Sequence, residues 1–128
     1  MSSVRLVPLL LRLGIVGTLA ETGYVHAHLY LGGYRVIPVI GTMFLLQAAV
    51  SFAVAALLVF VAPPILRLLA AGAAAGALFG FLLSRTVGVF GFTERGFDPA
   101  PDALLSVVAE VLCLLLIGVL WGRELRRG

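Results

Sequence analysis

The sequence predicts an all-α protein, a four-helix transmembrane bundle. The chain has 128 residues, of which 62% are hydrophobic and only 12% are charged, and its mean hydropathy is +1.16. Soluble domains of ordinary composition are far less apolar. A bilayer core of about 30 Å takes roughly 20 apolar residues per helix, so four spans use most of the chain and leave no room for a soluble domain. We therefore expect one transmembrane domain, residues 1–128.

The first span is expected at about residues 6–30. Its start resembles a signal peptide, with a basic residue, an apolar run and small residues near Ala20. Arg12 interrupts that run, however, and the hydrophobic stretch continues past Ala20 to Leu31. An uncleaved membrane anchor is therefore the preferred interpretation.

The other three spans are expected at about residues 37–61, 65–90 and 103–120. Pro63 and Pro64 end the second span, and Pro64 suits the first turn of the third. A polar loop, residues 91–101, precedes the fourth span. Asp102 lies in or beside the first turn of that span, where a carboxylate favours the helix dipole.

A ridge of small residues runs along the third span. Its members recur at every fourth position: Gly72, Gly76, Gly80, Ser84 and Gly88. Positions four apart stack on one face of a helix, and ridges of this kind let membrane helices approach closely. We expect the third span to pack at the centre of the bundle through this ridge.

Arginine counting sets the expected orientation, because cytoplasmic loops carry the excess of positive charge. Six of the nine arginines fall on the side of the two termini and three on the other side. This distribution predicts that both termini are cytoplasmic. All basic residues are arginine and the apolar set is rich in Ala, Gly, Val and Leu. That composition is typical of a GC-rich bacterial genome and predicts a multi-pass protein of the bacterial cytoplasmic membrane.

Polar residues gather in the half of the bundle away from the termini. The predicted intramembrane polar cluster consists of Glu21, Tyr24, His28, Arg85 and Glu110. The first three are three and seven residues apart, so they share a face of the first span. The depths expected for Glu21, Arg85 and Glu110 allow the three side chains to meet.

The charges of this cluster leave alternatives open. Two carboxylates face one guanidinium, and an uncompensated buried carboxylate takes up a proton or recruits a cation. Either His28 is protonated, or one glutamate is neutral, or an outside ion binds. A purely structural network that fixes helix register is the plainer interpretation.

Other chemistry has less support in the sequence. His26 and His28 are candidate haem or metal ligands, but residues two apart on a helix point about 200° from each other. The single cysteine, Cys113, excludes an internal disulfide. We find no nucleophile–base pair or phosphate loop, so we expect no enzyme activity. The net charge of +3 lies at the helix ends, which argues against nucleic-acid binding.

One resemblance bears on the first hairpin. The segments that carry it are His28-Leu29-Tyr30-Leu31, Gly33-Tyr34-Arg35, Ile37-Pro38, Ile40-Gly41 and Phe44-Leu45-Leu46-Gln47. In these the chain resembles small four-span membrane proteins of actinobacteria, an uncharacterised family. The resemblance implies a four-helix integral membrane protein and names no reaction.

The sequence thus leads to three hypotheses for function. The first is an accessory or scaffold subunit or a homo-oligomer, with a membrane protein as partner in the lipid bilayer. The second is a small proton, ion or solute transport unit that uses the polar cluster. The third is a haem- or metal-binding membrane protein that uses His26 or His28.

Overall fold

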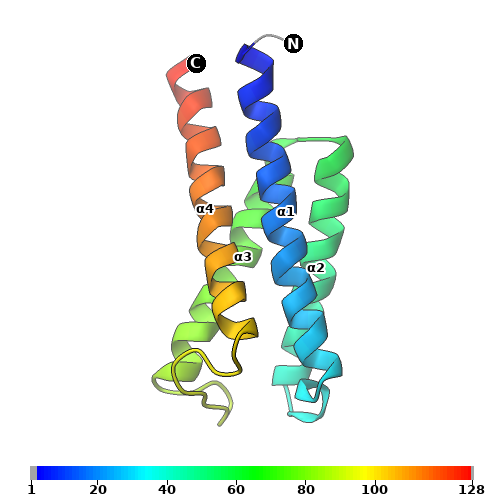
Figure 1. The fold of residues 1–128 in the computed structure, drawn as a ribbon, viewed down its shortest axis with the longest axis vertical. Coiled ribbons are helices and arrows are strands. Elements are labelled where there is room, and N and C mark those ends of the chain that lie inside the picture. Colours follow the sequence, from blue (N-terminus) through cyan, green and yellow to red (C-terminus); the bar gives the residue numbers. More distant parts are fainter. Residues whose placement is uncertain (1–2, 128) are drawn as a thin grey trace.

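The computed structural model describes residues 3–127, which form an all-α bundle and confirm the predicted fold class (Figure 1). The elements are α1 (Ser3–Leu31), the short 3-10 helix η1 (Tyr34–Val36), α2 (Ile40–Phe60), α3 (Pro64–Arg85) and α4 (Asp102–Arg127). Within the described residues, the four α-helices are each long and apolar enough to cross a membrane. Large hydrophobic side chains are exposed along all four, as a lipid-facing surface requires.

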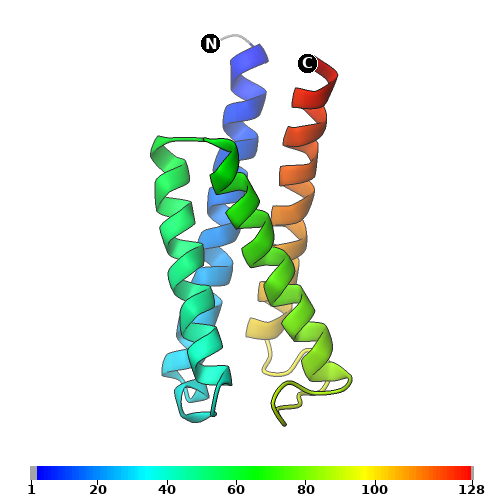
Figure 2. The same ribbon diagram turned by 180° about the vertical axis from the view of Figure 1, so that it is seen from behind.

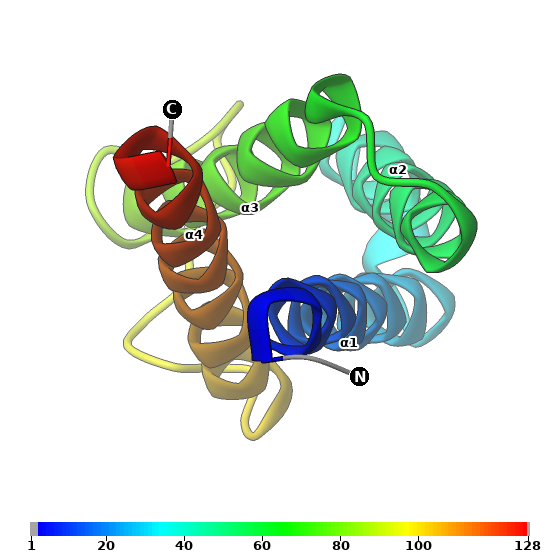
Figure 3. The same cartoon turned by 90° about the horizontal axis from the view of Figure 1, so that it is seen from above.

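The helices run alternately up and down and surround a common axis in chain order (Figures 1 and 3). α1 begins and α4 ends at one end of the bundle, beside the α2–α3 connection; we name this the terminal end. The opposite end holds residues 32–39 and 86–101 and is named the loop end. α1 packs extensively against α2 and α4. α3 crosses the bundle obliquely, starting beside α2 and ending towards α4 (Figure 2).

The prediction that the third span lies at the centre of the bundle is wrong. α3 makes fewer contacts with its neighbours than α1 does, and it barely touches α1. Its inward face carries Leu66, Ala70 and Ala74, which are buried in the core. The small residues that let α3 approach its neighbours are therefore alanines, on a different face from the glycines of the predicted ridge.

α3 also ends earlier than expected. The predicted span continued to residue 90, whereas the helix stops at Arg85. Gly88 lies beyond it with a left-handed backbone (φ +87°), and its N–H donates to the carbonyl oxygen of Leu83 at 2.6 Å. This is the usual way in which glycine ends a helix. Gly88 is thus a helix stop and not a member of a packing ridge.

The apolar core lies in the terminal half of the bundle. Buried side chains from all four helices contribute to it: Ile15, Leu19, Val54, Ala55, Leu58, Leu66, Ala70, Ala74, Cys113, Ile117 and Leu120. The loop half instead holds buried polar side chains, including Thr22, Ser106 and Glu110. The interior of the bundle is therefore mainly apolar in the terminal half and partly polar in the loop half.

Candidate functional site

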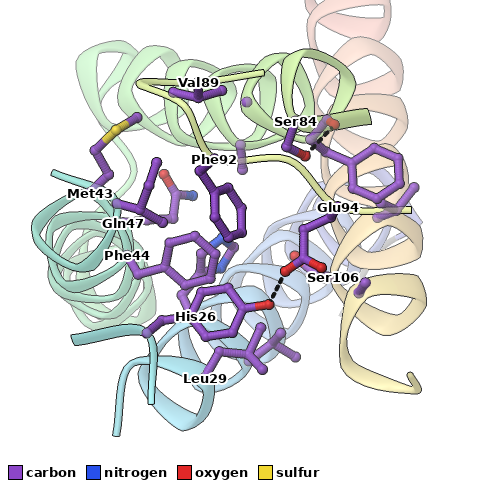
Figure 4. A pocket seen from close by; sticks show the side chains of 18 of the residues that line it. His26, Leu29, Met43, Phe44, Gln47, Ser84, Val89, Phe92, Glu94 and Ser106 are labelled. Carbon is purple, nitrogen blue, oxygen red and sulfur yellow. Dashed lines mark hydrogen bonds between the residues drawn. The ribbon is translucent and has the colours of Figure 1, made fainter. Parts of the chain in front are cut away.

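A cavity of about 140 Å³ opens in the loop half of the bundle (Figure 4). In this half α3 diverges from α2 (Figure 2). All four helices and both loops of the loop end contribute to its walls. The polar side chains that line it are His26, Tyr34, Gln47, Ser84, Arg85, Glu94, Ser106 and Glu110. The remaining walls are apolar and aromatic and include Phe44, Phe81 and Phe92. Apolar walls with a few polar groups are typical of small-ligand sites.

Glu110 is the most deeply buried charged group in this cavity, with 1% of its surface exposed. It lies about 12 Å along α4 from Asp102, at 1.5 Å per residue. Thr22 Oγ1 and Ser106 Oγ both donate to its Oε2 atom at 2.5 Å. Among the described residues, no arginine or histidine nitrogen lies within 4.0 Å of this carboxylate, and Oε1 makes no hydrogen bond. Two hydroxyl groups thus orient the carboxyl group, and among the described residues no cationic side chain pairs with it.

His26 extends this buried network towards the loop end. Its Nδ1 atom donates to the carbonyl oxygen of Thr22 at 2.8 Å and lies 3.3 Å from the Thr22 hydroxyl. The imidazole packs against Phe44, with ring centroids 5.0 Å apart. Since the backbone carbonyl occupies Nδ1, the cavity is left with Nε2 as the second ring nitrogen.

Tyr34 and Glu94 form the rim of the cavity at the loop end. The hydroxyl of Tyr34 donates to the Glu94 carboxylate, which links the first loop to the second (Figure 4). Burial, together with this hydrogen bond, raises the pKa of Tyr34 above its ordinary value, so the phenol stays protonated as a donor. Gly41 makes this placement possible, because a Cβ there would lie 2.7 Å from the Tyr34 carbonyl oxygen.

Arg85 closes the rim from the last residue of α3. Its guanidinium donates to Ser84 Oγ and to the carbonyl oxygens of Gly96 and Asp98, and it stacks over the Phe81 ring at 4.1 Å. It therefore ties the α3–α4 loop to the end of α3. The predicted ion pair of Arg85 with a buried glutamate is not formed in residues 3–127.

The predicted polar cluster is thus divided between two places. Arg85 and Glu110 line the cavity, while Glu21, Tyr24 and His28 lie exposed on the outer side of α1. Tyr24 stacks on His28, and His28 Nδ1 lies 2.7 Å from Asp102 Oδ2. The partner of His28 is therefore Asp102, and Glu21 does not meet Arg85 or Glu110.

Three glycines of the predicted ridge make no close contact with another helix of the described chain. A Cβ added at Gly72, Gly76 or Gly80 would meet nothing within 4 Å. Gly76 and Gly80 line the cavity, and Gly72 is exposed outside it. Ser84, also on the cavity wall, donates to the carbonyl oxygen of Phe81 at 2.7 Å. The missing side chains at Gly76 and Gly80 provide space for the cavity.

The two histidines considered as metal or haem ligands do not converge. His26 lines the cavity, whereas His28 is 58% exposed on the outside of α1. Within residues 3–127, no group of three His, Cys, Asp or Glu side chains is placed to hold a metal ion.

Sequence reasoning missed the two hydroxyl groups that hold Glu110. Ser106 lies four residues before Glu110 on α4, so the i, i+4 spacing could have identified it. Thr22 follows the buried positions Ile15 and Leu19 at helical spacing. That register places Thr22 inside and its neighbour Glu21 outside.

These features fit a multi-pass membrane protein with one polar cavity in its loop half. Comparison with protein-family models, with curated proteins and with solved structures finds no match to this chain. The resemblance to actinobacterial four-span proteins therefore stays a prediction.

Proposed function

We propose that this protein is a small transport unit that binds a small organic cation in the loop-end cavity, with Glu110 as its counter-charge. The observation that carries the proposal is the buried Glu110 carboxylate, which faces the cavity with two hydroxyl donors and no cationic partner. A buried carboxylate in this situation is stabilised by a bound cation or by a proton.

The charges on the cavity wall support one positive charge as cargo. Counted as ionised, Glu94 and Glu110 contribute two negative charges and Arg85 one positive charge, and with His26 counted as uncharged the excess is one negative charge. Phe44 and Phe92 add aromatic faces, which attract organic cations. A cavity of about 150 Å³ holds a molecule the size of benzene, so 140 Å³ suits a small amine or quaternary ammonium ion.

The orientation predicted by the arginine count fits this role. With both termini in the cytoplasm of a bacterial cell, the loop end faces outwards, and the cavity receives its solute from outside. The apolar core of the terminal half then separates the solute from the cytoplasm. In any one conformation, a transporter opens its binding site to only one side of the membrane, and this arrangement agrees with that requirement.

The test compares two glutamates in the same protein. Wild type, Glu110→Gln and Glu21→Gln are reconstituted in lipid nanodiscs, and binding of tetramethylammonium and methylammonium is measured by calorimetry, with tert-butanol as a neutral probe. We expect Glu110→Gln to weaken cation binding by about tenfold or more, which corresponds to about 1.4 kcal/mol. Glu21→Gln removes the same charge outside the cavity and serves as the matched control.

Equal cation binding by wild type and Glu110→Gln would refute the proposal. Uptake by proteoliposomes loaded with a pH-sensitive dye provides the second readout. Proton flux that depends on Glu110, with no cation binding, would instead identify a proton as the cargo.

A second candidate, an accessory subunit or homo-oligomer, is favoured by the exposure of Glu21. Glu21 lies ten residues before the end of α1, about 15 Å along the helix, which is near the middle of a 30 Å bilayer core. A carboxylate on a lipid-facing surface at this depth is costly, and a partner that covers it would remove that cost. Native mass spectrometry of Glu21→Leu tests this candidate. If Glu21 lies in an interface, the variant loses the oligomer or partner that wild type retains. If Glu21 faces lipid, the mass of the complex stays unchanged.

A further inference from the structure

A second cavity, of about 350 Å³, lies at the terminal end of the bundle, and Glu110 is not among the residues that line it. It is enclosed by the first half of α1, the end of α2, the start of α3 and the end of α4. The lining residues with charge are Arg5, Arg12, Arg67 and Glu124. Apolar side chains complete the wall, among them Leu9, Leu58 and Leu120.

The charged groups of this cavity are unbalanced. Three arginines, of which Arg5 is exposed to solvent, and one glutamate line the cavity, which gives an excess of two positive charges. Arg67 is 7% exposed, and its Nη1 atom donates to Glu124. Arg12 reaches only the carbonyl oxygen of Val59, at 3.5 Å. In the described part of the chain, the buried Nε atoms of Arg12 and Arg67 have no hydrogen-bond partner.

We propose that this cavity binds a phosphate group, carried either by an anionic phospholipid or by free phosphate. A buried guanidinium with unused N–H groups is stabilised by an anion that accepts several hydrogen bonds, and arginine matches phosphate oxygens bidentately. Basic pockets between membrane helices near the cytoplasmic surface recognise anionic headgroups in this way. The apolar wall provides a surface for the first carbons of a lipid chain.

Glu124 makes the proposal sharply testable, because it competes with the anion for Arg67. Glu124→Gln removes the only negative charge of the lining and is expected to tighten phosphate binding. Arg12→Gln removes a donor and is expected to weaken binding by about tenfold. A merely structural pair of Arg67 with Glu124 predicts no such opposite effects. Arg127→Gln is the matched control, since it removes the same charge from the exposed tail outside the cavity.

The experiment is native mass spectrometry of the full-length, delipidated protein titrated with phosphatidylglycerol, phosphatidylcholine or inorganic phosphate. We expect one bound phosphatidylglycerol per chain. Its affinity should be highest for Glu124→Gln, intermediate for wild type and Arg127→Gln, and lowest for Arg12→Gln. Retention of inorganic phosphate with the same order identifies free phosphate as a ligand of the same site. The proposal is overturned if phosphatidylglycerol and phosphatidylcholine bind equally, or if Arg12→Gln and Arg127→Gln weaken binding to the same extent. The absence of binding by either phosphate source also overturns it.

Discussion

A larger side chain on α3 that fills the loop-end cavity tests whether this cavity serves binding or folding. Gly76 lies on the cavity wall, and a Cβ added there meets no atom within 4 Å. Leucine adds four carbons, and six carbons of benzene fill a cavity of about 150 Å³. Gly76→Leu therefore occupies about two thirds of the 140 Å³ available. We expect binding of tetramethylammonium to weaken by at least about tenfold, because the remaining space is too small for it.

Stability is expected to move in the other direction. Leucine in place of glycine within a helix gains about 1 kcal/mol of helix propensity, and no neighbouring atom has to shift. The midpoint of thermal unfolding, followed in detergent by the fluorescence of the single tryptophan, should stay the same or rise. Gly72→Leu is the control: it has the same propensity gain and the same added volume, but Gly72 lies outside the cavity.

Two results would contradict this reasoning. If Gly76→Leu unfolds at a lower temperature than Gly72→Leu, Gly76 packs against another helix and the close-packing role of the ridge is restored. If Gly76→Leu binds tetramethylammonium as wild type does, the cation occupies another site.

The remaining predictions concern the supports of the cavity and the core. Gly41→Ala places a Cβ 2.7–2.8 Å from the carbonyl oxygens of Tyr34 and Arg35. We therefore expect the free energy of unfolding, measured with a chemical denaturant, to fall by about 1–3 kcal/mol and cation binding to weaken. An unchanged free energy of unfolding would contradict this. Because burial raises the pKa of Tyr34, the protonated phenol contributes to the free energy of unfolding fully below a pH of about 10, and this contribution is lost as the pH rises further. Tyr34→Phe should therefore lose less stability than wild type in unfolding titrations from about pH 9 to 12. Identical pH profiles of the two proteins would contradict this. Leu58→Ala, at a fully buried core position, should lower the free energy of unfolding by about 2–5 kcal/mol in the same denaturant titration. A decrease below about 1 kcal/mol would show that the core is loosely packed at this position.

The fold could be predicted because length and apolar composition decide it. Four runs of about 20 apolar residues in a chain of 128 allow few arrangements other than four spanning helices. The end of α3 could not be placed as easily, since the segment 86–90 is nearly as apolar as the helix before it. There the decisive event is local: Gly88 adopts a left-handed conformation and stops the helix.

The inside of the bundle was harder to predict, for a reason specific to membranes. In a soluble helix the apolar face is the buried face, but here lipid and core are equally apolar, so periodicity does not distinguish them. Glu21 and Glu110 therefore looked alike in the sequence. The structure exposes one and buries the other, because only Glu110 has Ser106 one turn away and Thr22 across the helix pair.

The proposed transport role points to α3 as the helix that must move. The path from Glu110 to the terminal end is blocked by the apolar core, where α1, α2 and α4 contribute Leu19, Leu58 and Ile117. α1 packs closely against α2 and α4, so opening any of those contacts disrupts the main packing of the bundle. α3 is bound more lightly: besides its apolar core residues, it is held at its start by the Arg67–Glu124 ion pair and further along by Gln47, whose Nε2 atom donates to the carbonyl oxygen of Ala73 at 3.0 Å. An anion that draws Arg67 away from Glu124 would loosen the ion pair at the start of α3, and the terminal cavity would thereby act on the loop-end cavity through α3.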